Sequence, residues 1–101
     1  MNKEYLDQIP DWAEIRVRWM DAYCPASGWH ETSDYEARDS TATTIGRLWK
    51  NFQDDYLTVV GTIFESELPE PETIADINHI PINWIVSVEI ISTSNNGEYN
   101  A

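Results

Sequence analysis

The most reactive side chains are one cysteine and two histidines, and their spacing does not match a known type of site. Cys24, His30 and His79 are the only thiol and imidazole groups in 101 residues. A zinc site usually draws its ligands from close pairs such as C-x₂-C, and the sequence has none. A nucleophilic Cys24 with His30 as its base would need an electropositive setting and oxyanion donors. Acids surround Cys24 instead, so we expect neither a metal site nor a catalytic thiol.

Neighbouring carboxylates offer acid–base chemistry in principle. Glu31 lies near Asp34, and Asp54 precedes Asp55, but acids placed like this in turns are usually solvated. The phosphate-binding patterns G-x-G-x-x-G and G-x-x-x-x-G-K-[ST] do not occur. The sequence therefore predicts a protein that is not an enzyme, needs no cofactor and acts by binding.

The acidic charge is the clearest functional signal. The formal net charge is -12, and residues 51–101 contain no Lys or Arg. Such a chain repels nucleic-acid phosphates and anionic membranes, but it attracts a basic protein surface. Solubility alone is the simpler explanation of the charge, and imitation of the DNA phosphate track is the more specific one. The acids expected to contact a partner are Asp54, Asp55, Glu65, Glu67, Glu70, Glu72 and Asp76.

Tryptophan is unusually frequent for a domain of this size. Five tryptophans exceed what a small core is expected to hide, and tryptophan is enriched at binding hot spots. Trp12, Trp29 and Trp49 are therefore candidates for a contact surface. The alternative is that they seal the ends of the fold.

A small basic patch is a second candidate site. Alternation places Arg16 and Arg18 on the same side of one strand, while Arg47 and Lys50 lie on or beside the next strand. Together they could hold the phosphate of a small anionic ligand such as a signalling nucleotide. The alternative is that these side chains pair with Glu14 and other acids.

These candidates must be positioned by a mostly β fold. Four segments have strand composition or alternation, and the clearest has Ile15, Val17 and Trp19 alternating with charged residues. We interpret 65–78 as a long connection with a turn of helix near 72–76, followed by a tight turn at 81–84. The predicted strands are 13–21, 41–49, 56–64 and 86–91.

The predicted architecture is a small, strongly bent antiparallel barrel, SH3-like or Sm-like, with short helical turns. Gly46 and Gly61 lie inside strands, where glycine often marks a bend, and closing the sheet would remove its exposed edges. We expect an arm or helical turn over 1–12, one barrel domain over 13–91 and a flexible tail over 92–101. The N-terminus has no signal-peptide pattern and no membrane-length apolar run occurs, so a cytoplasmic location is expected.

Several short motifs occur together in the chain, at 17–22, 28–29, 44–48, 54–59 and 80–88. In this order they resemble small uncharacterised accessory proteins of tailed bacteriophages and prophages. The resemblance implies no catalytic residues. It implies a setting in the host-cell cytoplasm, where the protein would inhibit or modulate a host protein such as a defence system or a nucleic-acid enzyme. The alternatives are an oligomeric sponge for a signalling nucleotide and a virion structural or assembly protein.

Overall fold

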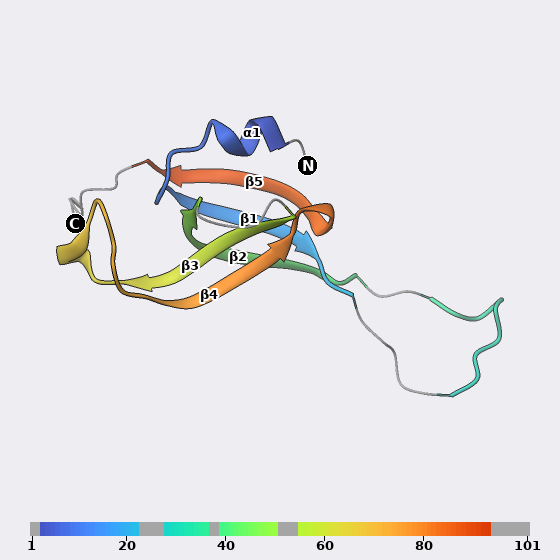
Figure 1. The fold of residues 1–101 in the computed structure, drawn as a ribbon. Helices are drawn as coiled ribbons and strands as arrows, with labels where there is room; N and C mark the ends of the chain where they lie inside the picture. Colours follow the sequence, from blue (N-terminus) through green and yellow to red (C-terminus); the bar gives the residue numbers. More distant parts are fainter. Residues whose placement is uncertain (1–2, 23–27, 37–38, 51–54, 94–101) are drawn as a thin grey trace.

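The computed structural model describes residues 3–22, 28–36, 39–50 and 55–93, which form one five-stranded antiparallel sheet with a short helix (Figure 1). The predicted mostly β fold is therefore confirmed. The strands predicted over 13–21, 41–49, 56–64 and 86–91 correspond to β1, β2, β3 and β5. In chain order the elements are α1 (Lys3–Asp7), β1 (Glu14–Met20), β2 (Thr41–Trp49), β3 (Tyr56–Ile63), η1 (Glu65–Glu67), β4 (Ile74–Pro81), η2 (Ile82–Trp84) and β5 (Ile85–Ser92).

The sheet is strongly coiled but open, with the strand order β4-β3-β2-β1-β5. β4 and β5 are its two edges, yet only the three residues of η2 join them, so the sheet must curl until the ends of its two edges meet. No ladder joins β4 to β5 among the described strands, so the predicted closed barrel is wrong. Pro81 ends β4 at this corner and has no N–H with which to begin such a ladder.

The alternation predicted for β1 is present. Ile15 and Val17 are fully buried, while Arg16 and Arg18 point to the outer face. Val17 lies opposite Val88 of β5, and register shifts near Ile15 and Trp19 mark irregularities that bend this pair of strands. The inner side of the coiled sheet therefore forms the core.

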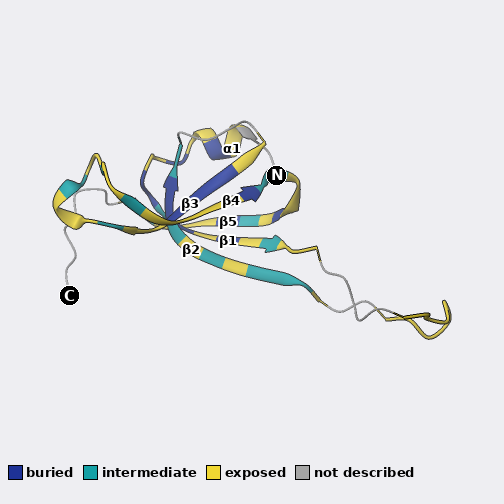
Figure 2. Ribbon diagram, turned by 60° about the horizontal axis from the view of Figure 1, so that its bottom comes forward, coloured by how far each residue is buried: buried dark blue, intermediate teal, exposed yellow. Residues whose placement is uncertain are grey.

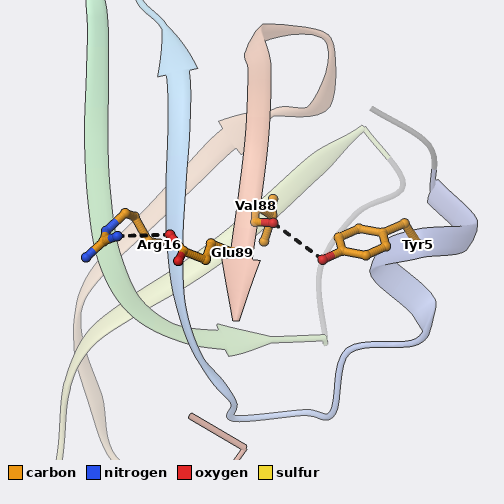
Figure 3. A network of polar contacts seen from close by, with 4 residues as sticks. All are labelled: Tyr5, Arg16, Val88 and Glu89. Atoms are coloured by element: carbon orange, nitrogen blue, oxygen red, sulfur yellow. Dashed lines mark hydrogen bonds and ion pairs between the residues drawn. The ribbon is translucent and has the colours of Figure 1, made fainter. Parts of the chain in front are cut away.

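The N-terminal segment closes one side of this core. Residues 1–12, which we expected to form an arm or helical turn, include α1, and both Leu6 and Ile9 are buried within the core cluster. The Tyr5 hydroxyl donates a 3.4 Å hydrogen bond to the Val88 carbonyl oxygen, which ties α1 to β5 (Figure 3). The cluster comprises Leu6, Ile9, Ala13, Ile15, Val17, Leu48, Leu57, Val59, Ile80, Ile85 and Val88.

The predicted connection over 65–78 is wrong in its second half, because β4 begins at Ile74. β4 pairs with β3 along its whole length. The predicted turn of helix near 72–76 is also wrong, since the helical turn is η1 at Glu65–Glu67. Exposed residues dominate β4 (Figure 2), so it lacks the buried alternation that identifies a strand from sequence.

Two further features of the fold position the candidate surfaces. β2 and β3 pair over only three residues each, at Arg47–Trp49 and Thr58–Val60, and then diverge. Residues 28–36, which belong to the connection between β1 and β2, lie well beyond the end of the sheet (Figure 1). None of the helices in the described ranges is long and apolar enough to cross a membrane. The expected tail over 92–101 lies almost entirely outside the described residues.

Candidate partner-binding surface

The segment that lies farthest from the sheet is residues 28–36, here called the projecting arm (Figure 1). It begins at Gly28, whose φ of 143° is a conformation that L side chains rarely adopt. Trp29 follows and is fully exposed. The indole therefore has its whole apolar surface in water, away from the core, which is an unusual place for the largest side chain.

The rest of the projecting arm has local structure and carries carboxylates. The N–H groups of Asp34 and Tyr35 donate to the Glu31 carbonyl oxygen at 3.0 and 3.1 Å, forming a tight turn. His30 contacts Tyr35 edge to face, with ring centroids 5.3 Å apart. Glu31 and Asp34 are exposed. The spacing of these two acids suggested only acid–base chemistry, but their closeness to Trp29 in the sequence also indicates a contact surface.

The predicted acidic residues do not form one track. Glu65, Glu67, Glu70 and Glu72 lie beyond the end of β3, whereas Asp55 lies just before its start. The eight residues of β3 separate the two groups by roughly 26 Å. Asp54 lies outside the described residues.

Two of the predicted contact acids have structural partners. An oxygen of the Glu67 carboxylate accepts the N–H groups of Glu72 and Thr73 at 3.1 and 2.9 Å and so holds the turn before β4. Asp76 accepts a hydrogen bond from the Thr62 hydroxyl and has a φ of 55°. Glu65, Glu70 and Glu72 remain exposed on this turn, and no Lys or Arg follows Lys50 in the sequence to neutralise them.

Trp12 and Trp49 stack on each other rather than forming a free aromatic surface. Their ring centroids lie 6.1 Å apart with planes 15° from parallel. Trp12 is 7% exposed and Trp49 is half-buried. Trp19 and Trp84 make a second stack, with centroids 6.4 Å apart. Of the three tryptophans predicted to contact a partner, Trp29 alone presents an uncovered ring.

The cations proposed to bind an anion are mostly engaged within the fold. Buried Arg47 donates to the Trp12 carbonyl oxygen at 2.9 Å and to the Glu14 carboxylate at 3.0 Å. The Lys50 ammonium donates to the Asp7 carbonyl oxygen at 3.0 Å. These bonds fasten the N-terminal segment to the end of β2, so the two cations have a structural role.

The other two cations lie on the outer face of β1. Arg16 pairs with Glu89 of β5 at 2.9 Å (Figure 3). Arg18 is exposed. The pKa of the Asp39 carboxyl is lowered, first by hydrogen bonds from the Thr41 N–H and hydroxyl and then by the charge of Arg18. The structure therefore does not gather the four cations around one pocket.

His79 has a structural role between two strands. The His79 Nδ1 shares a 2.8 Å hydrogen bond with the hydroxyl of buried Thr58, and its ring meets the edge of Tyr56. His79 thus helps to pair β3 with β4. Cys24 lies outside the described residues. Comparison of the chain with protein-family models, curated proteins and solved structures finds no match in any of the three.

Proposed function

We propose that this protein acts by binding a partner with a basic surface, and that the projecting arm is the main contact. The observation that carries the proposal is the fully exposed Trp29 beside the carboxylates of Glu31 and Asp34. A tryptophan that becomes buried in an interface on binding often supplies a large share of the binding energy. Neighbouring acids favour a cationic partner and repel an anionic one.

The charge of the whole chain supports the same kind of partner. A net charge of -12 produces a long-range field that speeds encounter with a basic protein. The turn with Glu65, Glu70 and Glu72 provides a second acidic surface at the far end of β3. Two separated acidic surfaces suit a partner with an extended basic surface. DNA mimicry against a nucleic-acid enzyme is the narrower form of this proposal, and it would rest on these two surfaces rather than on one continuous track of carboxylates.

The setting is part of the proposal. The resemblance to phage accessory proteins leads us to place the interaction in the cytoplasm of an infected bacterium, with a host defence system or nucleic-acid enzyme as the target.

The finer type of the fold is also part of the proposal. The strand order, with its two edges joined by the short turn η2, is consistent with an SH3-like or Sm-like arrangement that is opened between β4 and β5.

The test compares three tagged proteins as baits in bacterial lysate: the natural chain, Trp29→Ala and Val86→Ala. Val86 is the control because it is also an exposed apolar residue, at 52%, but lies on β5, outside the projecting arm and the acidic turn after β3. A protein retained by the natural chain and Val86→Ala, but not by Trp29→Ala, is then purified for affinity measurements. We expect Trp29→Ala to weaken binding by about 30-fold, which corresponds to about 2 kcal/mol at a hot spot.

Salt dependence tests the electrostatic part. The affinity of the purified pair should fall steeply as ionic strength rises, because salt screens exposed charges. Trp29→Ala should leave the free energy of unfolding within about 0.5 kcal/mol of the natural chain, since a fully exposed side chain supports no packing. Equal affinity of Trp29→Ala and the natural chain, or an affinity unchanged by salt, would contradict the proposal.

A further inference from the structure

The place where β2 and β3 separate leaves part of β2 without a neighbour on one side. β1 pairs with β2 from Thr41 to Arg47, whereas β3 pairs with β2 only from Arg47 to Trp49. In the part of the chain that the structure describes, no strand lies against the β3-facing side of residues 41–46. We call this side of residues 41–46 the open edge.

Alternation along β2 shows which backbone groups face the open edge. The Leu48 N–H donates to the Ala13 carbonyl oxygen, and the Leu48 carbonyl oxygen accepts from the Trp12 N–H, so Leu48 faces the β1 side. Successive residues of a strand direct these groups to opposite sides. Ser40, eight residues earlier, also faces the β1 side, because its carbonyl oxygen accepts from the Asp21 N–H at 3.0 Å.

The odd-numbered residues of β2 therefore face away from β1. The backbone groups of Arg47 face away from β1, and Arg47 pairs with Val60 of β3. The Thr41 N–H also faces away from β1, and it donates a 2.9 Å hydrogen bond to the Asp39 carboxylate. Between them, the N–H and C=O groups of Thr43 and Ile45 face the open edge, and both residues are exposed, Ile45 at 58%.

A cavity of about 260 Å³ lies at the apex, where the two strands separate. The apolar part of its lining comes from Ile45, Val60 and Ile63, and the Glu14–Arg47 pair supplies a charged part. Gly46 sets the apex, because its lack of a side chain lets β3 cross close to β2. The open edge thus combines a row of backbone donors and acceptors with a partly apolar cavity at one end.

We propose that an extended segment of the basic partner adds to the open edge as a further β-strand. Strand addition satisfies exposed edge groups with main-chain hydrogen bonds, while alternate side chains of the segment give specificity. A β-branched or apolar residue suits the position beside Ile45, since Ile45, Val60 and Ile63 supply the apolar part of the cavity lining. This inference rests on the proposed function and specifies a second point of contact with the same partner.

The charge of the chain identifies the occupant as cationic. Asp39 lies at one end of the open edge, and the protein carries a net charge of -12. A second copy carries the same net charge, so repulsion opposes pairing between two copies. An extended segment flanked by Lys or Arg is attracted by this net charge. The cations beside the open edge each face an acid: Arg16 pairs with Glu89, Arg47 pairs with Glu14, and the charge of Arg18 acts on Asp39.

The probe is a synthetic peptide, acetyl-Lys-Thr-Val-Thr-Val-Thr-Lys-amide, added to the full-length ¹⁵N-labelled protein. We expect the amide signals of Thr43 and Ile45 to shift and their hydrogen exchange to slow. The same peptide with N-methyl groups on alternate residues cannot make the pairing hydrogen bonds and should leave both signals in place. A version with Glu in place of both Lys residues should bind less tightly, and the difference should shrink as salt rises.

The variant is Thr43→Pro, matched with Thr43→Val. Proline removes only an N–H that faces the open edge, a position where edge strands tolerate it, while valine keeps the N–H and the side-chain volume. Thr43→Pro should weaken the affinity for the peptide roughly tenfold, because one hydrogen bond is lost and the proline ring crowds the adjacent hydrogen bonds. Thr43→Val should have little effect on this affinity. If Thr43→Pro fails to fold, the N-methylated peptide supplies the same comparison on the natural chain.

The outcomes separate this inference from the proposed function. Failure of the peptide to shift Thr43 and Ile45, or equal binding by the N-methylated peptide, overturns strand addition and leaves the role of Trp29 unaffected. Dimerisation of the free protein that Thr43→Pro abolishes would assign the open edge to a second copy and overturn the partner version. Peptide binding that survives Trp29→Ala but is lost in Thr43→Pro supports the open edge even if the projecting arm proves inactive.

Discussion

Replacing Gly46 with alanine tests whether β3 crosses β2 as closely as the structure indicates. An added Cβ would lie 2.6 Å from the Val59 Cγ1 atom and 2.7 Å from the Val60 carbonyl oxygen, well inside ordinary contact at 3.4–4 Å. Val59 is fully buried and the second atom belongs to the backbone, so neither neighbour can simply rotate away. The two strands must therefore move apart in the three-residue region where the described residues pair.

The expected loss can be placed in a range. Overpacking by one methyl group in a packed site costs roughly 1–3 kcal/mol, and the clash with backbone favours the upper half of that range. A loss of about 2 kcal/mol would lower the melting temperature of a domain of this size by about 10 °C. Gly61→Ala is the matched control, because its Cβ would lie 3.0 Å from the Asp76 Cβ atom, a contact that a small shift of exposed β4 can relieve.

Urea titration followed by tryptophan fluorescence, together with thermal melts by circular dichroism, measures both variants. We expect Gly46→Ala to be less stable than Gly61→Ala by at least about 1 kcal/mol. The contacts of an added Cβ at Gly46, 2.6 and 2.7 Å, are closer than those at Gly61, which are 3.0 Å to the Asp76 Cβ atom and 3.3 Å to its carbonyl oxygen. Equal stability of the two variants would refute the close crossing, and with it the position of the apex from which the open edge was inferred.

Two other predictions follow from single polar groups. Arg47→Met should lower the free energy of unfolding by about 2 kcal/mol, because it leaves the Trp12 carbonyl oxygen and the Glu14 carboxylate without the buried donor. Glu14→Gln should lower the free energy of unfolding by less. A larger loss in Glu14→Gln, measured by urea titration, would contradict the structural role of Arg47. Asp39 should titrate in NMR below the ordinary carboxyl value of 3.8, since the Thr41 hydrogen bonds stabilise its charged form. Its contribution to stability is then present above that value and is lost as pH falls through the lowered pKa, so in Asp39→Asn the acid limb of the stability curve should be flatter.

The four strands were recognised from two different signals. β1 shows alternation, with Ile15 and Val17 buried between exposed residues. β3 has no alternation, because Leu57 to Val60 are all buried, and its β-branched and aromatic composition identified it instead. β4 was missed because it is an edge strand with isoleucines at 74, 77 and 80, a spacing of three rather than two. The closed barrel was predicted to remove exposed edges, and local sequence carries no signal for the absence of a β4–β5 ladder.

The candidate surface was predictable only in part, for a similar reason. Composition singled out Trp29, but the same argument selected Trp12 and Trp49, and only the fold distinguishes an exposed indole from a stacked pair. The pairing of Arg47 with Glu14 was anticipated as an alternative, yet the Trp12 carbonyl oxygen as a further acceptor required coordinates. Charge counts likewise could not separate Asp55 from the acids at the opposite end of β3.

The open edge and the acidity of the chain have a connected physical explanation. Proteins usually guard a free strand edge with charges, proline or a covering element, because an uncharged β-branched edge invites pairing with another chain. The open edge of β2 reads Thr-Ala-Thr-Thr-Ile-Gly and has none of these within it. Repulsion between copies that each carry a net charge of -12 can provide that protection without covering the edge. The same charge attracts a basic segment, so one property of the sequence would keep the edge free of its own copies and available to a cationic partner.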